Sequence, residues 1–426
     1  LSLHDALPIS TDEKAAAYVA SYDVSDLSDI RELDRFRPAA TINTSVIPHN
    51  VHVLNDYLYV SYYTDGLILV DGARPENLVE VGNFDTYLGP HGGFNGAWGV
   101  YPYFPSGNIV VSDINNGLFV INATPIRACY LEGQVTDAAT GLPIQDAKVV
   151  IQSDEANIAQ SNISGDYKTG QATSGTFLVR FTKVGYNSLV TQAVLENGVI
   201  TILDVQMTAL PVYTISGIAI QEEDGQPVPN AKIQLISEQI TYNATTDNNG
   251  LFSVAAAYEG QYSIYGGVWG RLHAVLNDVV INANTEQLVV PLKKGYQDDF
   301  YFDLAWEKTA DGSTDAGFWV REIPIQVNNS GQISNPGSDI PDDLGESCYL
   351  TGNSTSTNPG AADVDGGRVY LKSPVMDLTT YQDPVISYNL WFYNAGGSST
   401  PDDSLIVRLS NGFQSIVLET VKQSSS

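Results

Sequence analysis

The sequence repeats itself with two different periods, and these internal repeats limit its fold more than any single motif does. At an offset of 84 residues a Gly, a Pro and an Ala recur in the same order. The three pairs are Gly133 and Gly217, Pro143 and Pro227, and Ala147 and Ala231. Self-similarity at a fixed spacing indicates repeated structural units. Residues 127–210 and 211–295 are therefore expected to share one fold.

Each half of this duplication is predicted to be a small β-sandwich. The first half runs through Gly133-Gln134-Val135-Thr136-Asp137, Gly141-Leu142-Pro143-Ile144 and Ala147-Lys148-Val149-Val150-Ile151. This order indicates a strand, a Gly-Pro turn and a strand. Both halves resemble the carboxypeptidase regulatory-like domain, which implies two tandem transthyretin-like β-sandwiches.

A shorter repeat occupies residues 11–126. At an offset of 48, Asp23, Ile30 and Phe36 align with Asp71, Leu78 and Phe84, and at an offset of 51 Gly66-Leu67 aligns with Gly117-Leu118. Repeats of roughly 40 to 50 residues with paired apolar strands and Asp/Asn-Gly turns are typical of propeller blades.

The segments 59–71 and 110–122 resemble the LVIVP-repeat propellers of the choice-of-anchor B family. This resemblance implies a partial β-propeller of two to three blades over residues 11–126, fewer than the roughly four to eight that a closed ring needs. The missing blades are expected upstream. Residues 1–10 resemble a translated sequencing adapter and are left out of the fold prediction, and both ends of the chain are expected to be truncated.

The last segment, residues 296–426, holds two strong strand candidates at 384–393 and 404–409, followed by a hairpin signal at Ser410-Asn411-Gly412. It resembles the MAM-like or concanavalin-like jelly rolls of secreted bacterial peptidases. The predicted fold class is therefore all-β: a partial propeller, two sandwiches and an incomplete C-terminal jelly roll.

Charge and cysteine content exclude several classes of function. The chain has 20 Lys and Arg against 49 Asp and Glu, a net charge of −29, which disfavours nucleic acid and anionic lipid as partners. Its two cysteines, Cys129 and Cys348, fall in different predicted modules, so a disulfide between them is not expected. The sequence has no apolar run long enough for a transmembrane helix.

The sequence contains no recognisable catalytic centre. The His-x-x-Glu zinc pair of metallocarboxypeptidases is absent, as are His-Glu-x-x-His, the Gly-x-Ser-x-Gly elbow and the phosphate-binding Gly-rich loop. The resemblance to a carboxypeptidase accessory domain therefore brings no peptidase activity with it, and the chain is predicted not to be an enzyme.

Two groups of polar residues are candidate binding sites. His49 and His52 lie three positions apart in one predicted strand region and are the pair of imidazoles that could share a ligand or metal; hydrogen bonding between blades is the simpler role. Acidic turns at Asp363 and Asp365, and at Asp342 and Asp343, offer oxygen ligands suited to Ca²⁺. Ordinary solvated turns explain these carboxylates equally well.

Exposed aromatic rings are the third kind of candidate, because sugar rings stack on Trp and Tyr. Trp269 and Trp319 are possible ligand contacts, whereas Trp391 lies in the most apolar predicted strand and is expected in the core.

The pattern favours a non-catalytic, secreted, outer-membrane or cell-surface protein of the type found in Bacteroidota, with β-sandwich spacers. Its expected partners are glycans or surface proteins. One alternative is an accessory region of a secreted hydrolase of the metallopeptidase type, and another is a purely structural spacer.

Overall fold

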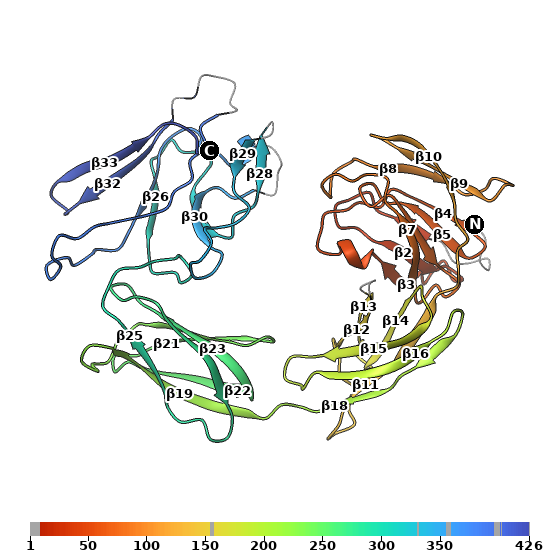
Figure 1. The fold of residues 1–426 in the computed structure, drawn as a ribbon, viewed down its shortest axis with the longest axis horizontal. Helices are drawn as coiled ribbons and strands as arrows, with labels where there is room; N and C mark the ends of the chain where they lie inside the picture. The colour runs from red at the N-terminus through yellow and green to blue at the C-terminus, as the bar shows by residue number, and fades with distance from the viewer. Residues whose placement is uncertain are drawn as a thin grey trace. The chain divides into compact units, whose positions relative to one another are not determined.

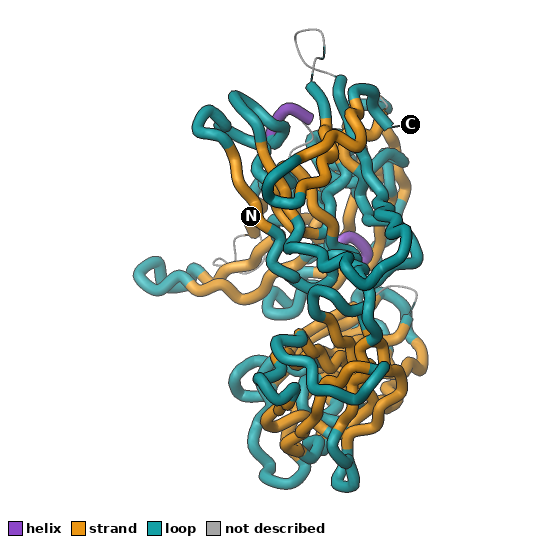
Figure 2. Tube along the Cα trace, turned by 90° about the vertical axis from the view of Figure 1, so that its left-hand side faces the viewer, coloured by secondary structure: helices purple, strands orange, loops and turns teal. Residues whose placement is uncertain are grey.

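The computed structural model describes residues 9–153, 157–329, 332–354, 359–395, 401 and 403–425. The described residues form strands and loops, with two single-turn 3-10 helices, η1 (Ala39–Thr41) and η2 (Pro359–Ala361), and no α-helix (Figure 2). The predicted all-β class is confirmed. The chain divides into two compact units that meet at Leu210 and Pro211, and each is described by itself (Figure 1).

The first unit begins with three antiparallel sheets whose strands pair in chain order. They consist of β1 (Ile9–Thr11), β2 (Val19–Asp23) and β3 (Arg31–Phe36); β4 (Asn50–Leu54), β5 (Tyr57–Ser61), β6 (Leu67–Asp71) and β7 (Val79–Phe84); and β8 (Ala97–Tyr101), β9 (Asn108–Asp113) and β10 (Gly117–Asn122). Strands β5, β6 and β7 each begin 48 residues after β1, β2 and β3, so the sequence repeat is a repeat of sheets. The described residues form no closed sheet, and the propeller stays a prediction.

The middle sheet is buried on both faces, which explains why β6 reads as a continuous apolar run. Leu58, Val60 and Ile68 pack toward the first sheet, in a layer with Val19 and Phe36. The alternate positions Tyr59, Leu67 and Leu69 pack against Val100, Ile109 and Val111 of the third sheet. The period-two alternation thus serves two separate apolar layers.

The first sandwich follows directly in the same unit. One sheet contains β11 (Cys129–Asp137), β14 (Asp166–Gln171), β17 (Ile200–Ile202) and β18 (Val205–Met207), and the other contains β12 (Lys148–Gln152), β13 (Asn157–Gln160), β15 (Gly175–Thr182) and β16 (Leu189–Leu195). Alternate residues of both sheets, such as Leu131, Ile151 and Phe181, are fully buried between them.

The second unit begins with a sandwich of matching topology. One sheet contains β19 (Val212–Gln221), β22 (Leu251–Tyr258) and β25 (Leu288–Leu292), and the other contains β20 (Lys232–Ile236), β21 (Thr241–Thr245), β23 (Gly260–Gly267) and β24 (Ala274–Ile281). The order β21-β20-β23-β24 repeats β13-β12-β15-β16. The duplication read from the sequence is therefore a duplication of structure.

A buried hydroxyl braces the Pro-containing turn of both sandwiches. In the first, Ser161 Oγ donates to Ile144 O (2.6 Å) and accepts the Ala147 N–H (2.9 Å). In the second, Thr246 Oγ1 donates to Val228 O (2.7 Å) and accepts the Ala231 N–H (2.8 Å). The match at Ala147 and Ala231 in the sequence thus reflects a shared, fully hydrogen-bonded turn.

A buried carboxylate joins the three sheets to the first sandwich. Asp71, at the end of β6, is fully buried and accepts hydrogen bonds from Arg127 Nη1 (2.7 Å), Tyr130 Oη (2.8 Å) and the N–H groups of Ala128 (2.8 Å) and Ala73 (3.0 Å). This carboxylate therefore fixes the start of the sandwich on the second sheet.

The remaining described strands pair only two at a time. They are β26 (Glu307–Ala310) with β31 (Val369–Lys372), β27 (Trp319–Glu322) with β30 (Cys348–Thr351), β28 (Val327–Asn329) with β29 (Gln332–Asn335), and β32 (Leu405–Ser410) with β33 (Ser415–Val421). The hairpin predicted at Ser410-Asn411-Gly412 is confirmed. The jelly roll stays a prediction.

The strand predicted at residues 384–393 is wrong, since no ladder forms there. Trp391 is 38% exposed instead of lying in the core. A β-prone sequence becomes a strand only when another strand pairs with it, and the backbone here instead bonds to the chain end, as in Ser425 N–H to Phe392 O (2.7 Å).

Candidate functional site

The best candidate site lies where the first strands of the second and third sheets, β4 and β8, run beside each other. Aromatic and polar side chains gather here, and we call this group the Trp98 site. Its members are Glu13, His49, Asn50, Tyr63, Phe94 and Trp98. Trp98 is 52% exposed and Phe94 59% exposed, so both rings are open to solvent.

A local irregularity in β8 presents Trp98. The β8–β9 register shifts between Ala97 and Gly99, and such a bulge re-aims the side chain that it contains. Just before it, Gly96 has φ +88°, and a Cβ there would lie 2.3 Å from Tyr63 O. The glycine therefore allows Tyr63 and Ala97 to exchange two backbone hydrogen bonds (2.8 and 3.1 Å).

His49 is the centre of the site. Its ring lies 5.1 Å from the Trp98 ring and 5.3 Å from the Tyr63 ring, centroid to centroid. Its Nδ1 contacts Trp98 O, and its Nε2 lies 3.5 Å from Glu13 Oε1. Asn50 Nδ2 lies 2.6 Å from the same Nδ1, so polar groups contact both nitrogens of the imidazole.

Glu13 and Asn50 supply the polar edge of the site. Tyr63 Oη donates to Glu13 Oε1 (2.5 Å), and burial, together with this carboxylate, raises the pKa of Tyr63 well above its ordinary value. The phenol therefore stays a neutral donor. Asn50 Nδ2 donates to Trp98 O (3.3 Å), so an amide, a carboxylate and exposed rings occur together.

His52 on β4 belongs to a neighbouring aromatic group. Its ring packs against Tyr103 (5.6 Å), and Tyr101 packs against Tyr103 (5.4 Å) and Phe104 (4.9 Å). Burial lowers the pKa of His52, so this imidazole is neutral at pH 7. The structure thus gives His49 and His52 different partners.

The structure gives the two predicted tryptophans different surroundings. Trp269 is half-buried, its Nε1–H donates to Val375 O (2.8 Å), and its ring lies 5.4 Å from Tyr296. Trp319 on β27 is half-buried too, with a buried Nε1 that has no hydrogen-bond partner. Neither ring is as open as Trp98.

The predicted calcium ligands do not converge on one point. Burial, followed by the nearby Asp365 charge, raises the pKa of Asp363, while burial, followed by the charge of Asp339, raises that of Asp343. Asp342 is exposed with φ +73°. Across the part of the chain that the structure describes, no three His, Cys, Asp or Glu side chains gather to hold a metal, so calcium stays a prediction.

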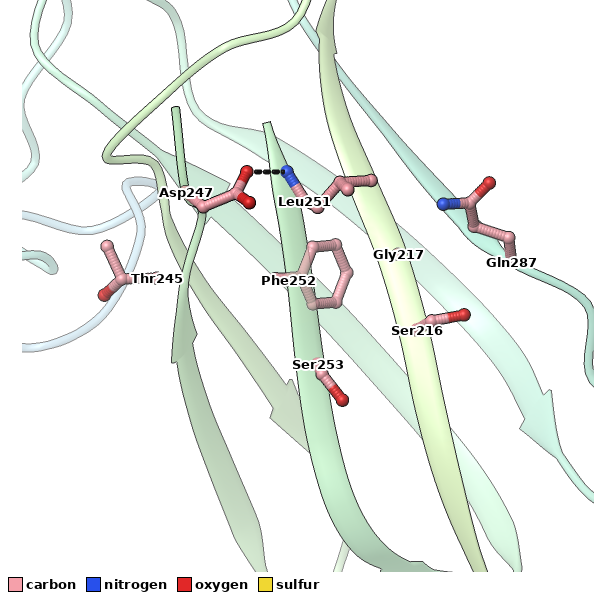
Figure 3. A pocket seen from close by; sticks show the side chains of 8 residues that line it. All are labelled: Ser216, Gly217, Thr245, Asp247, Leu251, Phe252, Ser253 and Gln287. Carbon is pink, nitrogen blue, oxygen red and sulfur yellow. Dashed lines mark hydrogen bonds between the residues drawn. The ribbon is translucent and has the colours of Figure 1, made fainter. Parts of the chain in front are cut away.

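A shallow depression of about 390 Å³ opens on the β22-β19-β25 sheet of the second sandwich (Figure 3). Its lining comprises Ser216, Gly217, Thr245, Asp247, Leu251, Phe252, Ser253 and Gln287. The Asp247 carboxylate accepts the Leu251 N–H (2.8 Å), so its turn already uses one of the oxygens. The Phe252 ring lies against Gly217.

Sequence reasoning missed Trp98, Phe94, Tyr63 and Glu13. One signal was present: Trp98 is the only tryptophan between residues 1 and 210. Its exposure follows from the bulge in β8, which the sequence does not announce.

Comparison with known proteins identifies one module. Residues 130–208 match the family model of the carboxypeptidase regulatory-like domain, which confirms that resemblance for the first sandwich. A search of curated proteins found no match. None of the described helices is long and apolar enough to cross a membrane.

Among solved structures, a streptococcal ancillary pilin is similar, with 11% identity, 64% of this chain and 84% of that chain covered, and a TM-score of 0.31. The minor pilin GBS52 of Streptococcus agalactiae has 11% identity, with 40% of this chain and 98% of that chain covered and a TM-score of 0.28. The shaft pilin spaA of Lactobacillus rhamnosus GG has 11% identity, with 40% of this chain and 98% of that chain covered and a TM-score of 0.21.

Proposed function

We propose that this chain is a non-catalytic binding protein of the cell surface or the secreted fraction, and that its Trp98 site holds carbohydrate. The observation that carries the proposal is the pair of open rings, Trp98 and Phe94, beside the Glu13 carboxylate and the Asn50 amide. The regulatory-like sandwich in residues 130–208 supports the non-catalytic part, with the sandwiches acting as spacers.

The chemistry of the Trp98 site suits a sugar. The C–H face of a pyranose stacks on an indole ring, and carboxylate and amide groups bind the hydroxyls at its edge. The net charge of −29 repels uronic, sialic and sulfated glycans. The expected ligand is therefore a neutral or amino sugar.

The architecture is proposed on similar grounds. The 48-residue repeat of sheets supports a partial propeller over residues 11–126, and the shared strand order supports a second regulatory-like sandwich over residues 211–295. The jelly-roll module over 296–426 and a source in Bacteroidota rest on sequence resemblance. The alternatives remain an accessory region of a secreted hydrolase and a structural spacer.

A glycan array probed with the full chain, followed by titration of any bound sugar, tests the proposal. Trp98→Ala should weaken binding at least tenfold, because a stacked aromatic ring contributes about 1.5 kcal/mol. Trp391→Ala is the matched control, since this ring is also exposed but lies in the other unit. Binding of no glycan, or equal loss in both variants, would refute the proposed function.

A further inference from the structure

A second group of exposed rings lies at the end of β8 and in the loop that follows it. Tyr101, Tyr103 and Phe104 are 47%, 41% and 46% exposed. The Tyr101 ring lies 5.4 Å from Tyr103 and 4.9 Å from Phe104, centroid to centroid. We call these three residues the Tyr101 group. Single exposed apolar side chains are common on protein surfaces, whereas a cluster of them indicates a binding surface.

The Tyr101 group continues the Trp98 site along β4. Asn50 Nδ2 donates to Trp98 O (3.3 Å), and the His52 ring lies 5.6 Å from the Tyr103 ring. Asn50 and His52 are two positions apart on β4, so their side chains leave the same face of the strand. At about 3.3 Å per residue, these two contacts are about 7 Å apart along the strand. This distance exceeds the length of one pyranose ring, so a sugar stacked on Trp98 leaves the Tyr101 group free for a later unit of the same chain.

The segment that carries these rings has no Asp, Glu, Lys or Arg. Residues 86–112 are the longest such stretch of a sequence in which 16% of the residues are charged. Burial lowers the pKa of His52, so the imidazole beside the Tyr101 group is also uncharged at pH 7. The same segment offers the hydroxyl of the exposed Ser106 and the amide of the half-buried Asn95. Rings and uncharged hydrogen-bonding groups suit a neutral glycan, because they have no charge with which to attract an ionic one.

We propose that the Trp98 site and the Tyr101 group form one binding strip for a neutral, extended oligosaccharide, with one sugar on Trp98 and a later sugar on Tyr101 and Phe104. This inference rests on the proposed function, because it needs carbohydrate at the Trp98 site. It adds the length of the ligand, its neutrality and the residues of its second contact. A proline-rich peptide also binds exposed rings. It fits less well here, because proline has no N–H to donate to the Glu13 carboxylate, whereas sugar hydroxyls donate and accept.

Calorimetric titration of the full chain with neutral β-linked glycans tests the strip. The probes are the disaccharide and the hexasaccharide of glucose, xylose, mannose and N-acetylglucosamine. The hexasaccharide of the sugar that binds should bind about tenfold more tightly than its disaccharide, the usual gain from stacking on a further aromatic surface. The double variant Tyr101→Ala, Phe104→Ala should remove this gain and leave the disaccharide affinity unchanged. Tyr101→Leu, Phe104→Leu keeps the apolar bulk without a flat ring and should act in the same way, whereas Trp98→Ala should weaken binding of both lengths.

Phe84→Ala is the matched control, because Phe84 is a 43% exposed ring on β7 of the same unit, outside the strip. It should change neither affinity. Equal affinity for the two lengths overturns the strip, as does a gain that both double variants keep or that Phe84→Ala removes equally. In these cases the proposed function stands if Trp98→Ala still weakens binding. Binding of no glycan, or of a proline-rich peptide alone, overturns the strip and the proposed function together.

Discussion

Replacement of Asp71 by Asn should open the joint between the three sheets and the first sandwich. The Asp71 side chain is fully buried and accepts from Arg127, Tyr130, Ala73 and Ala128. An amide keeps the shape, yet it removes the charge that pairs with Arg127. It also turns an N–H₂ toward groups that are themselves donors.

The magnitude follows from burial. Loss of one member of a buried ion pair costs about 3–5 kcal/mol, because the remaining charge and donors stay unpaired. Arg127 has a second partner, Asp56, at 3.0 Å, but that carboxylate is 36% exposed. An exposed pair contributes about 0–1 kcal/mol. Asp56→Asn is therefore a control that touches the same guanidinium, and Asn also tolerates the left-handed backbone at Asp56 (φ +65°).

Native-state hydrogen exchange of peptides that cover β6 and β11 measures the effect locally, which is needed because a chain of several modules does not unfold in one step. Asp71→Asn should lower the opening free energy of both strands by about 3 kcal/mol, and Asp56→Asn by less than about 1 kcal/mol. The reasoning fails if Asp71→Asn changes exchange by less than about 0.5 kcal/mol, below the usual value of a single buried hydrogen bond. Equal effects of the two variants would refute it too.

Two further results are expected. Burial raises the pKa of Asp298 above its ordinary 3.8, so the folded state binds this proton more tightly and the second unit loses stability as pH rises through the raised pKa. In urea melts, the stability of the wild-type chain relative to Asp298→Asn should therefore increase as pH falls from 7 to 4. A relative stability that decreases over this range would contradict the prediction. In the sandwiches, a Cβ on Gly133 would lie 2.2 Å from the backbone oxygen of Leu203, and one on Gly217 would lie 2.1 Å from the Phe252 ring. Because a ring can turn and a backbone cannot, Gly133→Ala should cost about 3 kcal/mol and Gly217→Ala about 1 kcal/mol, measured by exchange within each sandwich; a larger loss at Gly217 would refute the reasoning.

Local pattern was a good guide wherever the chain pairs with its own neighbours. The Asn411-Gly412 turn predicted the hairpin of β32 and β33, because a tight turn and two adjacent strands need no distant partner. The segment 384–393 has equally strong β-prone residues, yet it forms no strand. A lone strand leaves its backbone groups unpaired, so its formation depends on which other segment comes alongside.

For the candidate sites too, the sequence predicted residue types, whereas their contacts and exposure depend on the fold. The sequence placed His49 and His52 on one strand, whereas β4 begins at Asn50 and contains only His52. It named Trp269 and Trp319 and not Trp98, because residue type carries no information about exposure. The indole N–H of Trp269 donates a hydrogen bond to Val375 O. These two residues are far apart in the sequence and lie close together in the folded chain alone. The bulge that exposes Trp98 arises from the register between β8 and β9.

The all-β class, the repeats at 48 and 84 residues and the absence of the common catalytic motifs can be read from the amino-acid sequence, since these depend on residue type and spacing along the chain. Which faces of the sheets are covered becomes visible in the folded chain alone. Leu67 and Leu118 occupy the same place in the repeat and are the same residue, yet one is buried and the other exposed. Burial depends on what packs against a strand, and that is a property of the assembled sheets.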